Sequence, residues 1–245
     1  MNKYIMFLAC IGLLWACDIY TTDSGGGSTG KGGSMARFAC KGGYLYVLSS
    51  HTLSTYDISD SSKIQLKSRT TVGGTMETLF PTDSLLFMGS TSGMYIYNLK
   101  NPSTPKFISL YTHFTSCDPV VVQGQYAFVT LRSNADSWSC SRNVNELQVI
   151  DIRNINHPIE KVNYPMINPK GLAIDGNRIF VCDGMNLVVM DAGDPLMMTE
   201  LKRITLDGMP YDLIAKNGLL TVSYSAGIKQ YAYDGDTIQK LSVIY

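Results

Sequence analysis

The chain has 245 residues, 45% of them hydrophobic, and its 20 Lys and Arg balance its 20 Asp and Glu. This length is enough for one or two packed domains. It has no basic excess and no Lys/Arg-rich run, which argues against a nucleic-acid partner.

Residues 1–16 have the pattern of an export signal. Lys3 gives a positive start, and the apolar run from Tyr4 to Leu14 is too short to span a bilayer but fits a secretory signal. The residues LWAC, ending in Cys17, resemble the bacterial lipobox. The resemblance implies cleavage before Cys17 and lipidation of its thiol, with palmitate among the fatty acids that the cysteine carries. An ordinary signal peptide with an incidental Cys is the alternative.

A lipidated Cys17 would make the membrane a partner through a lipid anchor. We expect an exported bacterial lipoprotein, located at the outer membrane or cell surface in preference to the inner membrane. Residues 17–34 hold the lipid site and a segment rich in Gly, Ser and Thr, which predicts a flexible tether. Residues 35–245 are expected to form the globular part.

Five copies of one unit follow the tether. A short apolar motif recurs at residues 53–57, 94–98, 147–151, 187–191 and 228–232, and the motif ends are spaced by 41, 53, 40 and 41 residues. An earlier apolar strand ends 10 residues before the motif end in four copies and 22 before it in the third. The third copy therefore carries a 12-residue insertion between these two strands.

Each copy is predicted to contain four short strands separated by turns rich in Gly, Asn, Asp and Pro. Four strands per unit of about 40 residues is the spacing of a β-propeller blade. The predicted fold is therefore all-β, a β-propeller of about five four-stranded antiparallel blades. Closure of the ring would depend on packing of the first blade against the fifth.

Residues 147–162 (LQVIDIRNINHPIEKV) and 187–201 (LVVMDAGDPLMMTEL) resemble the LVIVD-repeat proteins, in which an apolar strand ends in Asp before a Pro-containing turn. The resemblance covers about residues 36–245 and implies a blade fold without a particular chemistry. Many bacterial members look like secreted lipoproteins. The fifth copy departs from the pattern because Ala232 replaces the Asp, and the first copy has no Pro in its turn.

The cysteines after Cys17 fall into two groups. Cys117 precedes the innermost strand of the third blade, and Cys140 lies in the insertion, so both are expected on one face of the disc. A Cys117–Cys140 disulfide would close a loop of about 24 residues and stabilise by ~3 kcal/mol; two free thiols are the alternative. Cys40 and Cys182 are expected to be small buried side chains. Without CxxC or His/Cys spacing, we expect neither a metal site nor a cofactor.

Charged residues are predicted to gather at the mouth of the central channel. Alignment of the blades on their first turn places Ala36, Glu77, Asp118, Lys170 and Asp212 at one position, where the innermost strand begins. The three carboxylates and the Lys could hold a cation or a polar ligand there. Alternatively, each carboxylate accepts backbone N–H bonds in the loop between blades.

The insertion, residues 133–146, is the second candidate site. It contains Trp138, with Arg142 nearby, and is expected on the same face as the channel mouth. An exposed Trp suits stacking on a sugar ring or anchoring in a protein partner. Alternatively, Trp138 folds down over the blade.

No catalytic motif is present, and the three histidines fall in different blades. We therefore assign no catalytic residue. The favoured function is a binding or scaffold module that meets a protein or a glycan. The alternative is an enzyme that depends on a metal or small ligand and uses the carboxylates at the channel mouth.

Overall fold

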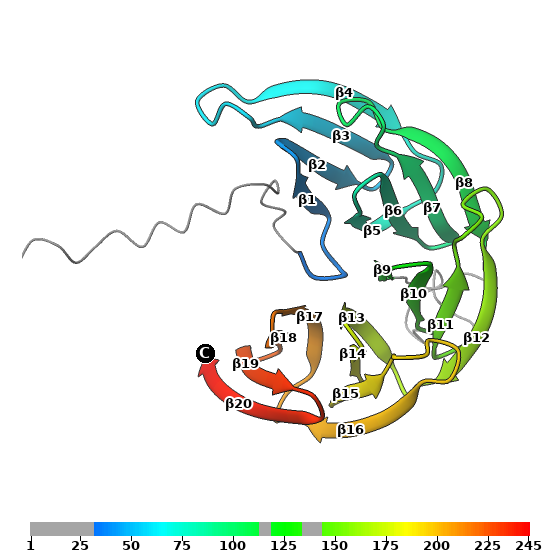
Figure 1. Cartoon of the computed structure of the whole chain (residues 1–245). Helices are drawn as coiled ribbons and strands as arrows, with labels where there is room; N and C mark the ends of the chain where they lie inside the picture. The colour runs from blue at the N-terminus through cyan, green and yellow to red at the C-terminus, as the bar shows by residue number, and fades with distance from the viewer. Residues whose placement is uncertain (1–31, 113–118, 134–143) are drawn as a thin grey trace, which may run out of the picture.

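The computed structural model describes residues 32–112, 119–133 and 144–245, and its regular structure is entirely β-strand. The strands form five four-stranded antiparallel sheets, each built in chain order from the axis outward (Figure 1). Within these ranges no helix is long and apolar enough to cross a membrane. The predicted all-β, five-bladed architecture is confirmed.

We number the sheets as blades 1 to 5. Blade 1 contains β1 (Phe38–Lys41), β2 (Tyr44–Ser49), β3 (Thr52–Asp57) and β4 (Gln65–Thr71). Blade 2 contains β5 (Met76–Pro81), β6 (Leu85–Ser90), β7 (Gly93–Asn98) and β8 (Lys106–Thr112). Blade 3 contains β9 (Val120–Gln123), β10 (Tyr126–Leu131), β11 (Glu146–Asp151) and β12 (Ile159–Pro165). Blade 4 contains β13 (Pro169–Asp175), β14 (Arg178–Asp183), β15 (Asn186–Asp191) and β16 (Thr199–Thr205). Blade 5 contains β17 (Pro210–Lys216), β18 (Leu219–Tyr224), β19 (Gly227–Asp234) and β20 (Thr237–Ile244).

The Asp that ends the repeat motif also ends the third strand of its blade. Asp57, Asp151 and Asp191 each accept a hydrogen bond from the backbone N–H two residues further on, at 3.0 Å. Such a turn, closed by the Asp side chain, bends the chain away from the strand ladder. The motif thus fixes where the third strand stops.

Blade 5 shows what happens without this Asp. At Ala232 no side chain can close the turn, and β19 runs on to Asp234. Both β19 and β20 have eight residues, whereas the third strands of the other blades have six. The departure from the repeat lengthens the last hairpin and leaves the blade intact.

The core lies between the blades. Four clusters of buried hydrophobic residues join blade 1 to 2, blade 2 to 3, blade 3 to 4 and blade 4 to 5. Among the described residues, no such cluster joins blade 5 to blade 1, and Figure 1 shows the sheets as an arc that is open between these two blades. Packing of the first blade against the fifth is therefore not seen.

The structure also locates the insertion and two of the cysteines. Residues 132–145 separate β10 from β11, where the insertion was predicted. Cys40 and Cys182 lie in β1 and β14 as free thiols, and complete burial raises the pKa of Cys182. The predicted lipid site at Cys17 and the predicted Cys117–Cys140 disulfide lie outside the described residues.

Candidate functional site

The innermost strands of blades 2, 4 and 5 begin with an irregularity in their pairing to the next strand. The register shifts between Met76 and Thr78, between Pro169 and Leu172, and between Pro210 and Asp212. An extra residue in one strand of an antiparallel pair re-aims the side chains beside it. These bulges place Glu77, Lys170 and Tyr211 at equivalent positions at one end of the central channel.

This register corrects the position assigned to Asp212. Arg178 pairs with Asp175 and Leu219 with Lys216, so Tyr211, and not Asp212, is the counterpart of Lys170. The error arises from the first turn of blade 5, where Asn217 takes a positive φ of 52° and Gly218 one of 77°. Alignment on the glycine alone shifts the blade by one residue.

Asp212 binds the segment that precedes blade 1. Its carboxylate accepts hydrogen bonds from the Ser34 hydroxyl at 3.0 Å and the Met35 N–H at 3.1 Å. The hydroxyl of Ser34, which is 1% exposed, accepts in turn from the Leu172 N–H at 2.8 Å. Burial raises the pKa of Asp212 despite these hydrogen bonds. The fold therefore includes Ser34, which the sequence analysis placed in the tether.

Glu77 and Lys170 line one cavity, at the end of the channel where the innermost strands begin. This mouth cavity has a volume of about 460 Å³. Its wall comes from blades 1 to 4 and their connections, with Met35, Arg37, Ser50, Thr75, Met76, Glu77, Thr78, Pro119, Arg132 and Lys170 as lining residues.

Three cationic side chains and one carboxylate face the mouth cavity among the described residues. Arg37 donates to the Met76 carbonyl at 2.9 Å and forms no ion pair with another described residue. Arg132 and Glu77 both have polar partners. Lys170 is 8% exposed, and burial, followed by the nearby charge of Arg132, lowers its pKa. The sequence analysis found Glu77 and Lys170 but missed both arginines, because neither occupies the aligned position.

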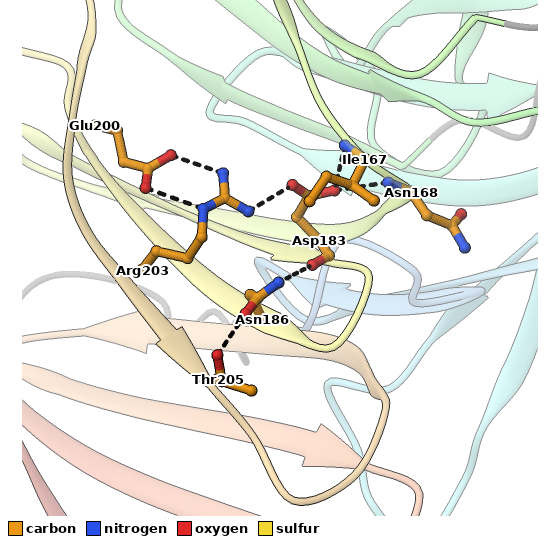
Figure 2. A network of polar contacts seen from close by, with 7 residues as sticks. All are labelled: Ile167, Asn168, Asp183, Asn186, Glu200, Arg203 and Thr205. Carbon is orange, nitrogen blue, oxygen red and sulfur yellow. Dashed lines mark hydrogen bonds and ion pairs between the residues drawn. The ribbon is translucent and has the colours of Figure 1, made fainter.

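A polar network holds the chain just before Lys170 (Figure 2). The fully buried Asp183 accepts the N–H groups of Ile167 and Asn168 at 2.8 and 2.7 Å through one oxygen. Its second oxygen accepts from Arg203 at 3.0 Å, and Arg203 also pairs with Glu200. The network fixes the connection from blade 3 to blade 4, and so the start of β13.

Asn186 and Thr205 extend this network. The Asn186 side chain donates to the Asp183 carbonyl at 3.3 Å and accepts from the Thr205 hydroxyl at 2.9 Å (Figure 2). Sequence reasoning did not identify this network. A signal was present, however, because an Asp that follows the buried run of β14 needs partners wherever it is buried.

The other predicted site residues, Asp118, Trp138 and Arg142, lie outside the described residues. The insertion leaves the described structure beside the mouth cavity, since Arg132 lines it. The chain returns at Val144, and the next residue, Asn145, accepts the Ser133 N–H at 3.1 Å. The two ends of the insertion are thus joined next to the cavity.

Five four-stranded sheets set around one channel make the protein a β-propeller. The LVIVD repeat family matches residues 32–72 and 140–165, in blades 1 and 3. The chain thus carries matches to the LVIVD repeat within a β-propeller fold, and the resemblance noted in its sequence is confirmed. A search of curated proteins gives no match.

Solved structures show the same fold at low sequence identity. A functionally unknown protein from Desulfotomaculum acetoxidans matches with a TM-score of 0.67 and 13% identity, over 82% of this chain and 66% of its own. A periplasmic gluconolactonase, PpgL, from Pseudomonas aeruginosa matches with a TM-score of 0.65 and 11% identity, over 83% of this chain and 67% of its own. A Lactobacillus plantarum protein matches with a TM-score of 0.65 and 16% identity, over 83% and 72%. The chain thus spans about two thirds of the length of the first two.

Proposed function

We propose that this protein is a ligand-binding module of the bacterial cell envelope, held at a membrane by a lipid on Cys17, with the mouth cavity as its binding site. The cavity carries the proposal. Its volume of about 460 Å³ lies within the range of small-ligand sites, roughly 300–1,000 Å³. Its charged side chains come from separate blades and converge on one space, as in sites that fix a ligand's orientation.

The insertion would add to this site. Residues on a long loop beside a rigid scaffold are well placed for recognition. Trp138 and Arg142 would then contact the ligand, or a protein or glycan that carries it. We assign no activity from the neighbours, because a gluconolactonase and proteins of other kinds share this fold.

The carboxylate-based enzyme is less well supported. Asp212 is one of the three carboxylates that such an enzyme would use, and it already accepts hydrogen bonds from Ser34 and Met35. The described residues contain no group of three or more His, Cys, Asp or Glu side chains suited to a metal ion. The favoured function is therefore binding.

The proposed site is tested by a thermal-shift screen of the exported chain with Cys17→Ser, against sugars, organic acids, phosphates and cell-wall fragments. We expect at least one class to raise the melting temperature. The same class should act weakly on Glu77→Gln and fully on Lys216→Met, an exposed position at the opposite end of the channel. Equal shifts in both variants would place binding elsewhere.

The proposed anchor has a separate test. Cells that express the full chain are labelled with an alkyne analogue of palmitate, and protease is added to intact cells. We expect label on the wild type, none on Cys17→Ala, and digestion by external protease if the protein is at the surface. Equal labelling of both forms would rule out a lipid on Cys17.

A further inference from the structure

Within residues 32–112, 119–133 and 144–245, Lys170 is a buried cation without a carboxylate partner. Its ammonium group contacts the Met209 sulfur at 2.7 Å and lies 4.7 Å from the centre of the Tyr211 ring. No Asp or Glu of the described chain pairs with it, although the residue is only 8% exposed. A buried charge is costly unless it is paired, and a thioether and an aromatic face compensate only in part.

The surroundings of Lys170 add positive charge. Arg132 also lines the mouth cavity and acts on Lys170 as a like charge. Arg37, on the wall contributed by the segment before β1, has a backbone carbonyl as its partner. Glu77 is the single carboxylate on the described wall, against three cations. The described part of the wall therefore carries more cationic than anionic side chains.

We infer that the mouth cavity binds a small organic anion, whose carboxylate or phosphate group lies between Lys170 and Arg132. This inference rests on the proposed function of the cavity and names the class of its ligand. Hydrogen bonds between a cation and an anionic oxygen are stronger than neutral ones, and a guanidinium can hold two oxygens at once. An anion here would supply the partner that Lys170 lacks and would relieve the repulsion from Arg132.

Glu77 adds a second element of selectivity. A carboxylate on the same wall repels a second anionic group but accepts hydrogen bonds from hydroxyls. The cavity would thus favour an anionic group at one end of the ligand and hydroxyls at the other, as in a hydroxy acid or a sugar phosphate. The volume of about 460 Å³ is sufficient for such a molecule.

The site is preorganised by the network around Asp183. Because Asp183 binds the backbone of Ile167 and Asn168, the strand that carries Lys170 starts at a fixed place. The Thr130 hydroxyl donates to the Lys170 carbonyl at 2.6 Å and fixes its backbone from blade 3. A cation held in place before binding loses little freedom when the ligand arrives.

The experiment is calorimetric titration of the exported chain carrying Cys17→Ser, at physiological ionic strength, with gluconate, glucose 6-phosphate, inorganic phosphate and, as the neutral control, glucose. We expect saturable binding of at least one of the anions and none of glucose. Lys170→Met should weaken binding at least tenfold, and Lys216→Met should leave it unchanged. Lys170→Arg, which keeps the charge, should retain part of the affinity and controls for folding.

The outcomes separate the inference from the proposed function. Preference for gluconate identifies a carboxylate ligand, and preference for the phosphates identifies a phosphorylated one; both support the inference. Tight binding of glucose, unaffected by Lys170→Met, would overturn the anionic class while the cavity remains a binding site. Equal weakening by Lys170→Met and Lys216→Met would mean unspecific attraction and would overturn it too. If no probe binds in this titration and no compound binds in the thermal-shift screen, both proposals are overturned.

Discussion

Blades 4 and 5 have the same strand order. They differ in the side chains on the face that points away from the preceding blade, toward the next blade position around the axis. In blade 4 this face carries Phe180, Cys182 and Val189, all buried against blade 5. The equivalent positions of blade 5 are Thr221, Ser223 and Gln230, all only partly buried. The same arrangement of strands therefore forms an interface in one case and a more polar, partly solvated face in the other. The side chains, and not the strand pattern, decide which blades pack.

Blade 1 differs again, because its face toward blade 5 leaves large hydrophobic side chains exposed. Phe38 and Leu66 remain 64% and 49% exposed, while Leu172, the counterpart of Phe38 in blade 4, is fully buried against blade 3. Because four interfaces are packed and the fifth is open, we expect stability to be concentrated between blades. The following predictions test this contrast, from the largest effect to the smallest.

Phe180→Ala should lower the free energy of unfolding by about 3–5 kcal/mol, because it leaves a cavity between blades 4 and 5. The ring is fully buried, with its centre 4.8 Å from that of Tyr233. Thr221→Ala, at the same position of blade 5, should cost about 0.5 kcal/mol or less. Urea unfolding measures both. Similar decreases in the free energy of unfolding would mean that the face of blade 5 that carries Thr221 is packed in solution.

Asp183→Ala should cost about 3 kcal/mol, because it removes the acceptor of two backbone N–H groups and of Arg203. Tyr224 occupies the same position in blade 5, and its buried hydroxyl has no hydrogen-bond partner in the part of the chain that the structure describes. Tyr224→Phe should therefore have little effect. Chemical denaturation of each variant measures the free energy of unfolding. A large decrease in Tyr224→Phe would show that the Tyr224 hydroxyl is hydrogen-bonded in solution.

Ser34→Ala should lower the free energy of unfolding by about 1–2 kcal/mol, because Ser34 joins Asp212 to the Leu172 N–H. This contact ties the segment before blade 1 to blades 4 and 5. Ser84→Ala, at an exposed turn, is the control and should be neutral. Thermal unfolding with the same loss in both variants would contradict the assigned role of Ser34.

Asp151→Asn tests the repeat motif itself through pH. Hydrogen bonds from Arg153 lower the pKa of Asp151 from 3.8 to about 2. A carboxyl whose pKa is lower in the folded state contributes stability above pH 3.8 and loses that contribution as the pH falls towards 2. The wild type should therefore lose stability over this range more steeply than Asp151→Asn. Parallel pH profiles from circular dichroism melts would show that the bond does not persist in solution.

The repeats made the fold predictable, because a period of about 40 residues with four apolar strands has few structural solutions. Even the insertion was located, since four copies define the spacing that the third one breaks. The alignment of Asp212 failed because Gly218 stands one place later in its turn than Gly176 does in blade 4. A turn that accepts either Asn or Gly at a positive φ gives no unique register.

The candidate site was only partly predictable for a related reason. Glu77 and Lys170 sit at equivalent points of the repeat, so that comparison of the copies finds them. Arg37 and Arg132 reach the mouth cavity from a leading segment and from the strand end before the insertion, outside the aligned position. The partners of Asp183 lie in three different parts of blade 4 and its approach, which only the folded chain brings together.

The central claim is that the mouth cavity binds an anion through Lys170, and one measurement tests it most directly. The lysines are dimethylated with ¹³C-formaldehyde, and Lys170 is assigned as the signal lost in Lys170→Met. Since burial lowers the pKa of Lys170, this signal should titrate at a pH below the usual range for lysine. Saturating gluconate or glucose 6-phosphate should shift the signal and raise its pKa, while the Lys216 signal stays in place. A Lys170 signal unmoved by every anion that binds the protein would contradict the claim.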